Sequence, residues 1–335
     1  MNLPKALSSA PVTGRIRTVP EDFVVEELPA FEASGEGEHL LLTIQKRGMN
    51  TAFCAQQIAR WASIDERDVS YAGMKDRHAL TTQRFSVRLP KKISPDVSAL
   101  NTDECTVLNA IWHNKKLARG ALVGNRFILS LREITADKTE LEKSLQHIKT
   151  QGVPNYFGEQ RFGQEQANVG MALGMFQGRR VDRAKRSIYL SAARSTVFNH
   201  LLAERVAQGN WNQALAGDVW MLEGTKSIFG PEAFTDELAQ RLAELDIHPT
   251  GPMWGAGELR SQEKVLELEA KLVAQFPEIC NGLAKADLRQ ERRALRLLVK
   301  NLSWNFVAAD VLQLSFELPP GAYATSVLAE LGDFS

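Results

Sequence analysis

A strand pattern near the end of the chain constrains the fold more than any other feature of the sequence. Four large apolar residues there alternate with polar or small ones; they are Leu312, Leu314, Phe316 and Leu318. This period of two indicates a strand with one buried face, and a single strand is not stable alone. Similar alternation occurs early in the chain, at residues 40–45, 84–89 and 127–131, whereas the residues between are mainly helical by their apolar spacing. The last strand is therefore predicted to pair with strands from the first half.

This pairing divides the chain into two domains, for which 335 residues are sufficient. A junction rich in glycine and proline at residues 151–158 marks where the chain leaves the first domain. We predict a discontinuous α+β domain with a mixed or antiparallel sheet, made of residues 1–150 and 303–335. Residues 151–302 are predicted to form an inserted, mainly helical α+β domain.

The insertion carries basic residues at regular spacing. Arg289, Arg293, Arg296 and Lys300 recur at steps of four, three and four, which would place them on one face of a helix. A second basic run occupies residues 179–186. Such a face is often only solvated, but it also suits RNA phosphates. Both interpretations remain open, with Arg293 and Arg296 as the candidate RNA contacts.

Composition excludes several classes of protein. The net charge is zero, so the overall charge does not indicate nucleic-acid binding, although a neutral total can hide a basic groove. Cys54, Cys105 and Cys280 are odd in number and far apart, which argues against a disulfide framework and for a reducing, cytoplasmic setting. The histidines and cysteines lack metal-ligand spacing, so no metal is expected. We also expect no signal peptide and no membrane-spanning segment.

The stretch from Tyr71 to Gln83 joins two strand-like runs and concentrates charged groups. It places Asp76 between Lys75 and Arg77, with His78 next. A carboxylate among fixed cations keeps its negative charge, and such a group suits a nucleophile better than a general acid. On these residues alone, a solvated surface loop is the favoured interpretation.

Two further segments place aromatic and amide side chains at the starts of strands. Phe23 follows the turn sequence Pro20-Glu21-Asp22, and Asn125 precedes Phe127, which opens an alternating run. On these residues alone, core packing of Phe23 is as good an interpretation as a binding role, and a turn is the preferred interpretation of Asn125.

The residues Gly73 to Gln83 resemble the G-x-K-D-x-x-A-x-T-x-Q signature of the TruD family of tRNA pseudouridine synthases. In that family the aspartate is catalytic, which the resemblance places on Asp76. Three more segments resemble family motifs in the family's order; they are residues 20–27, 115–127 and 320–325.

These motifs imply substrate contacts at Phe23, Asn125, Phe127 and Tyr323. The family commonly has lysine three residues before the proline of the first motif, where this chain has Arg17. The charge is kept but the geometry differs, because lysine and arginine bind differently. Lys75, Arg77 or Arg17 could hold the carboxylate of Asp76 ionised and oriented, and His78 is a further supporting candidate.

The resemblance implies a pseudouridine synthase catalytic domain interrupted by an inserted domain. It further implies isomerisation of the uridine at position 13 of certain tRNAs, without a cofactor. Asp76 would attack C1′ of the ribose or deprotonate the sugar, and the sequence does not choose between these. We expect tRNA as the partner, a monomer, and no small-molecule cofactor. The competing interpretations are a non-catalytic RNA-binding or RNA-folding protein and a hydrolase with a second carboxylate.

Overall fold

The computed structural model describes residues 3–7 and 12–335, which form two compact units. The first, here called the sheet unit, contains the described residues of Pro11–Thr139, Val299–Gly321 and Gly332–Ser335. The second, the helical unit, contains those of Met1–Ala10, Glu140–Leu298 and Ala322–Leu331. The chain thus leaves the sheet unit and returns to it near the C-terminus. The domain boundaries given above, 1–150 with 303–335 and 151–302, remain a prediction.

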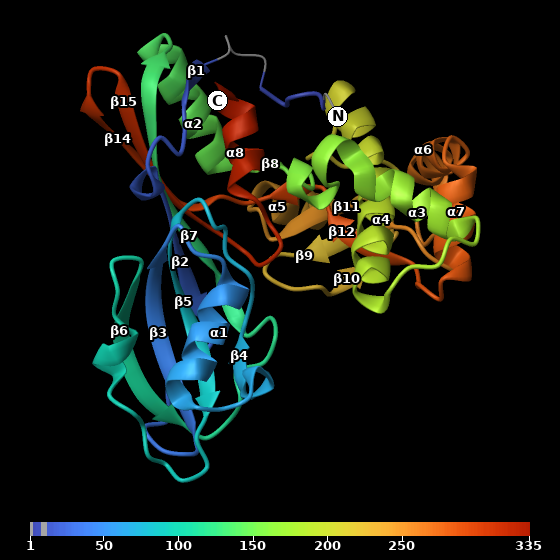
Figure 1. The fold of residues 1–335 in the computed structure, drawn as a ribbon. Helices are drawn as coiled ribbons and strands as arrows, with labels where there is room; N and C mark the ends of the chain where they lie inside the picture. Colours follow the sequence, from blue (N-terminus) through green and yellow to red (C-terminus); the bar gives the residue numbers. More distant parts are fainter. Residues whose placement is uncertain (1–2, 8–11) are drawn as a thin grey trace. The chain divides into compact units, whose positions relative to one another are not determined.

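The sheet unit is built on one mixed sheet (Figure 1). Its strands are β1 (Val12–Arg15), β2 (Phe23–Pro29), β3 (His39–Arg47), β4 (Val69–Tyr71), β5 (Leu80–Arg88), β6 (Cys105–His113), β7 (Leu122–Thr135), β14 (Lys300–Ala308), β15 (Val311–Leu318) and β16 (Gly332–Phe334). The main path runs β14-β15-β7-β2-β5-β3-β6. Because β2–β5 and β1–β16 are parallel and the other pairs antiparallel, the predicted α+β class with a mixed sheet is confirmed.

The C-terminal strand pairs as its sequence pattern indicates. β15 lies antiparallel to β7, with Phe316 opposite Phe127 and Leu314 opposite Leu129. Phe316, Leu314 and Leu129 are fully buried. The prediction that the last strand joins strands from the first half of the chain is confirmed.

One helix covers part of the sheet. α1 (Thr51–Ala62) begins after Asn50, whose Oδ1 accepts a hydrogen bond from the backbone N–H of Phe53 at 2.7 Å. Ala55 and Ile58 of α1 pack with Ile44 of β3 and Phe85 of β5 in one apolar cluster. Figure 1 shows α1 against these strands. The neighbouring strands β2 and β7 carry the side chains considered below.

The helical unit is organised around one long helix. Its helices are α2 (Lys138–Gln151), α3 (Ala167–Phe176), α4 (Arg183–Ala207), α5 (Asp236–Ala243), α6 (Glu263–Val273), α7 (Pro277–Lys285) and α8 (Ala324–Leu331). Its short strands are β8 (Val153–Pro154), β9 (Trp220–Leu222), β10 (Ile228–Phe229), β11 (Ile247–Met253), β12 (Glu291–Ala294) and β13 (Arg296–Leu297). Val197 and Leu201 of α4 pack with α3 and α7, while Phe198 and Leu202 pack in a second cluster. No helix within the described residues is long and apolar enough to cross a membrane.

The prediction of a helix that carries Arg289, Arg293, Arg296 and Lys300 is wrong. This segment forms β12, β13 and the start of β14, and β12 pairs antiparallel with β11. The backbone hydrogen bonds to β11 and the burial of Leu295 and Leu297 favour strands over the helical period of the arginines. These basic side chains therefore do not share one helical face.

Candidate active site

The loop between β4 and β5 is held in place by two buried polar side chains. Thr51 Oγ1 donates to Gln83 Oε1 at 2.9 Å and accepts from the backbone N–H of Lys75 at 2.9 Å. Gln83 Nε2 donates to the carbonyl of Gly73 at 3.1 Å. Thr51 and Gln83 are fully buried. This brace, Thr51 and Gln83, positions the backbone immediately before Asp76.

The brace makes a testable prediction for Thr51. Thr51→Val removes the hydroxyl and leaves buried partners unsatisfied, at a cost of about 1–3 kcal/mol. Because the loop loses its anchor, we expect kcat to fall several-fold with KM nearly unchanged. Thr51→Ser keeps the hydroxyl and is the matched control. Equal kinetics for both variants, measured on the same substrate, would show that the brace does not position the loop.

Asp76 is anchored at both carboxylate oxygens. Oδ2 accepts from Arg17 Nη2 at 2.7 Å, and Oδ1 accepts from the backbone N–H of His78 at 3.0 Å. The side chain of Asp76 is 22% exposed, so a reacting group can reach it. The guanidinium of Arg17 also lies 4.2 Å from the centroid of the Phe23 ring. Arg17 thus joins the carboxylate to the aromatic ring at the start of β2.

The two neighbours of Asp76 in the sequence have other roles. Lys75 Nζ lies 3.0 Å from Glu27 Oε2, and both side chains are almost fully buried. Arg77 and His78 are exposed. Of the three cations predicted as possible partners of Asp76, the structure pairs Arg17 with it and Lys75 with Glu27.

The predicted base-binding residues from β2 and β7 share one face of the sheet. Asn125 is the register partner of Glu27, and the rings of Phe23 and Phe127 meet edge to face, 6.3 Å apart. Phe127 is only 7% exposed and also stacks on Phe316. Asn125 Oδ1 is buried and has no hydrogen-bond partner within the described structure. An unpaired buried amide oxygen is costly, so this atom is available for a donor from a ligand.

Lys46 lies on the same face and was not identified from the sequence. It is fully buried at the end of β3, is the register partner of Thr81, and donates from Nζ to the carbonyl of Met49 at 2.6 Å. Burial lowers the pKa of Lys46 to about 8, opposed in part by the negative charge of Asp76. No sequence signal indicated this environment, because Lys46 sits in an ordinary alternating run.

Tyr323 belongs to the helical unit. Its hydroxyl accepts from Arg161 Nη2 at 2.9 Å, and its ring lies beside Gly158. The structure therefore brings Asp76, Arg17, Phe23, Asn125 and Phe127 together, and Tyr323 has its contacts in the other unit. Arg161 was not identified from the sequence.

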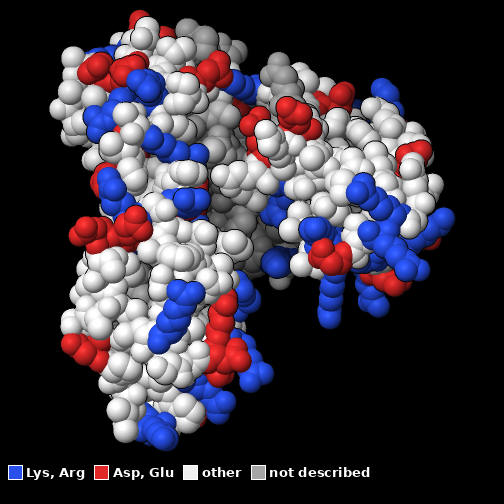
Figure 2. All heavy atoms as spheres, in the orientation of Figure 1, with Lys and Arg blue, Asp and Glu red and all other residues white. Residues whose placement is uncertain are grey.

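The candidate RNA contacts of the insertion differ in exposure. Arg296 is buried and donates to His248 Nδ1 at 2.9 Å, and Arg293 lies 4.1 Å from the centroid of Phe157. Burial lowers the pKa of each guanidinium to about 10. By contrast, the run at residues 179–186 is mostly exposed, and Figure 2 shows basic side chains gathered over the α3–α4 segment.

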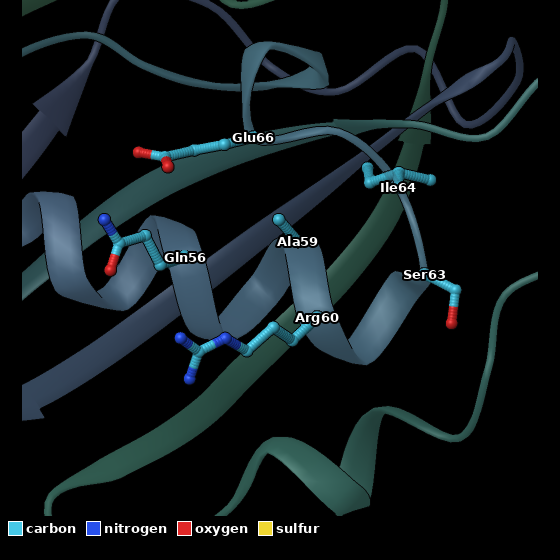
Figure 3. Close-up of a pocket in the computed structure, with 6 residues that line it drawn as sticks. All are labelled: Gln56, Ala59, Arg60, Ser63, Ile64 and Glu66. Atoms are coloured by element: carbon cyan, nitrogen blue, oxygen red, sulfur yellow. The ribbon is translucent and has the colours of Figure 1, made fainter.

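Two surface hollows are lined in part by residues of α1. The smaller, about 420 Å³, is lined by Gln56, Ala59, Arg60, Ser63, Ile64 and Glu66. Figure 3 shows the first three projecting from α1 and Glu66 from the segment that follows. The larger, about 610 Å³, adjoins Tyr71, next to the loop of Asp76. In the described part of the chain, no three His, Cys, Asp or Glu side chains gather as metal ligands.

Comparisons with known proteins agree over almost the whole chain. The family model described as tRNA pseudouridine synthase D (TruD) matches residues 5–175 and 177–331. A tRNA pseudouridine synthase D of Xanthomonas euvesicatoria is 52% identical, covering 99% of this chain and 94% of the relative. One from Methylococcus capsulatus is 46% identical over 99% of this chain and 95% of its own length.

A solved structure shares the fold. It is described as a putative tRNA pseudouridine synthase D from Methanosarcina mazei, with a TM-score of 0.73. The two chains are 21% identical, and the match covers 99% of this chain and 98% of the other.

Proposed function

The chain belongs to the tRNA pseudouridine synthase D (TruD) family, and we propose that it isomerises the uridine at position 13 of tRNA with Asp76 as the catalytic residue. The observation that carries the proposal is the Asp76 carboxylate, held by Arg17 at 2.7 Å. Arg17 also lies over the ring of Phe23, which shares one face of β2 and β7 with Asn125 and Phe127. Arg17 fixes the direction of one carboxylate oxygen of Asp76 through this contact, and the backbone N–H of His78 fixes the other.

The reaction breaks the N1–C1′ bond of the uridine and forms a C5–C1′ bond. Asp76 either attacks C1′ directly or removes a proton from the sugar next to it. On the first route the bond between Asp76 and C1′ breaks as C5 bonds to C1′. The proton on C5 is then lost and N1 takes up a proton, so the product is an isomer of uridine and no redox partner is needed. Asn125 Oδ1 lacks a partner among the described residues and can accept the N3–H of uracil, which stays free throughout the isomerisation. This contact would hold the detached base while it turns.

The target uridine must leave its stack to reach Asp76, at a cost of a few kcal/mol. Phosphate contacts elsewhere on the protein would offset that cost. The exposed basic run at residues 179–186 is a better candidate for such contacts than Arg293 or Arg296, because both of these guanidiniums are engaged inside the helical unit. We propose tRNA as the partner of a cytoplasmic, monomeric enzyme that uses no cofactor or metal.

The test is incubation of the purified protein with tRNA transcripts labelled in uridine, without cofactors, followed by nucleoside analysis. Pseudouridine at position 13 is expected. Tight tRNA binding without any pseudouridine would instead support the alternative, a non-catalytic RNA-binding or RNA-folding protein.

A conservative change tests the ring of Phe127. Phe127 is buried between Phe23 and Phe316, so alanine would also leave a core cavity. Phe127→Leu keeps most of the apolar volume and removes the aromatic face. Losing stacking of ~1–3 kcal/mol should lower turnover more than affinity for whole tRNA, because phosphate contacts dominate that affinity. Equal losses in single-turnover rate and in Kd would mean that Phe127 has only a packing role.

A further inference from the structure

The larger surface hollow, of about 610 Å³, lies wholly within the sheet unit. Two segments line most of it: residues 66–71, which lead into the loop of Asp76, and residues 116–119, between β6 and β7. The two segments meet through a hydrogen bond from the backbone N–H of Gly120 to the carbonyl of Ala72, at 2.8 Å. Tyr71 is the last residue of β4, so the hollow borders the start of the loop that carries Asp76.

Its lining combines positive charge with an aromatic ring. Arg67, Lys116 and Arg119 are exposed cations, against a single carboxylate, Glu66. The guanidinium of Arg119 lies 4.1 Å from the centroid of the Tyr71 ring. Val69 and Leu117 add buried apolar surface.

Internal contacts fix this arrangement but leave donors for a ligand. The Tyr71 ring packs edge-on against Phe85 of the core, 5.8 Å away, which holds its position. Lys116 Nζ donates to the carbonyl of Arg67 at 3.1 Å, which draws both residues to one side of the hollow. A guanidinium has five N–H donors, so Arg119 can stack on Tyr71 and still bind a phosphate.

We propose that this hollow binds a nucleotide that flanks the target uridine in the RNA strand. Its base stacks on the Arg119–Tyr71 pair. Its phosphates lie against the free N–H donors of Arg119 and against Lys116 and Arg67. Guanidinium planes and aromatic rings are the surfaces on which splayed RNA bases stack, and the open, positively charged lining suits a polynucleotide backbone. The inference rests on the proposed function, because it places the flanking nucleotide relative to a uridine at Asp76.

The neighbouring hollow offers a matched control. Arg60 lines it from α1, is also exposed, and lies in the same unit (Figure 3). Arg119→Gln and Arg60→Gln each remove one exposed guanidinium. We expect only Arg119→Gln to raise KM for tRNA, about three- to tenfold, with kcat unchanged. It should also flatten the slope of log affinity against log salt by about 0.7–0.9, the value of one phosphate contact.

A cross-link supplies a readout that does not depend on turnover. tRNA transcripts carrying single 4-thiouridines next to the target are irradiated with the protein, and the modified peptides are mapped. Adducts within residues 66–71 or 116–119 are expected, and Tyr71→Leu should weaken them. If Arg119→Gln and Arg60→Gln have the same KM and salt slope, and the adducts lie elsewhere, the inference is overturned. If wild-type protein makes no pseudouridine, the proposed function fails instead, and the adducts still show whether the hollow holds RNA.

Discussion

Replacing Asp76 with asparagine is expected to abolish pseudouridine formation while tRNA binding stays nearly intact. Asparagine keeps the size of the side chain and can still accept a hydrogen bond from Arg17, which lies 2.7 Å from the carboxylate. It removes the negative charge, and with it the nucleophile or base. Loss of such a group lowers the rate by about 10²–10⁴ or more. Single-turnover rates at saturating tRNA measure the effect, with Kd measured separately.

The control is Asp103→Asn, which changes an exposed aspartate of the same unit, in a turn before β6. Its rate should equal that of wild type. A rate for Asp76→Asn within tenfold of wild type would refute the catalytic assignment. A rate loss accompanied by an equal loss of tRNA affinity would point to a damaged loop rather than to missing chemistry.

The second large effect is expected from the buried pair of Glu27 and Lys75. Their side chains are 2% and 5% exposed. Water therefore cannot solvate either charge if its partner is removed. Glu27→Gln leaves Lys75 charged and unpaired, which should destabilise the sheet unit by about 3–5 kcal/mol. The substituted amide would keep an oxygen for the backbone N–H of Arg84, which donates to Glu27 at 3.1 Å in the wild type.

Urea denaturation measures the loss in the free energy of unfolding. Hydrogen exchange of the backbone amides of β2 and β5 localises that loss to the sheet unit. Adding Lys75→Met to Glu27→Gln removes the unpaired charge and should restore most of the stability. Glu21→Gln is the control, because Glu21 pairs with Arg47 at 2.6 Å with both side chains about half exposed. An exposed pair contributes only about 0–1 kcal/mol. A similar small change for both glutamates would show that the Glu27–Lys75 pair is not effectively buried.

The pair also links stability to catalysis. Lys75 directly precedes Asp76, and its backbone N–H is bound by Thr51 while its side chain is bound by Glu27. The residue before Asp76, the proposed catalytic residue, is thus held at two points from two different elements. This is the supporting structure that a positioned carboxylate requires.

The sequence by itself determined the features that depend on local pattern. The period of two at Leu312–Leu318 predicted β15, because alternation is a property of neighbouring residues. The signature around Asp76 and the motifs at Phe23, Asn125 and Phe127 predicted the members of the site. These motifs also occur in the same order as in the TruD family, and the family model matches the chain over these segments.

Only the tertiary structure decided which residues face each other. Lys75 and Arg17 were equal candidates to hold Asp76, and the fold separated them by placing Glu27 of β2 against Lys75. The spacing of Arg293 and Arg296 predicted a helix, but pairing of β12 with β11 and of β13 with β8, together with burial of the neighbouring leucines, made strands. Residues spaced at the helical period can still form strands when their backbone pairs with segments far away in the sequence. Burial and hydrogen bonding across strands then outweigh helix propensities, which differ by less than about 1 kcal/mol per residue.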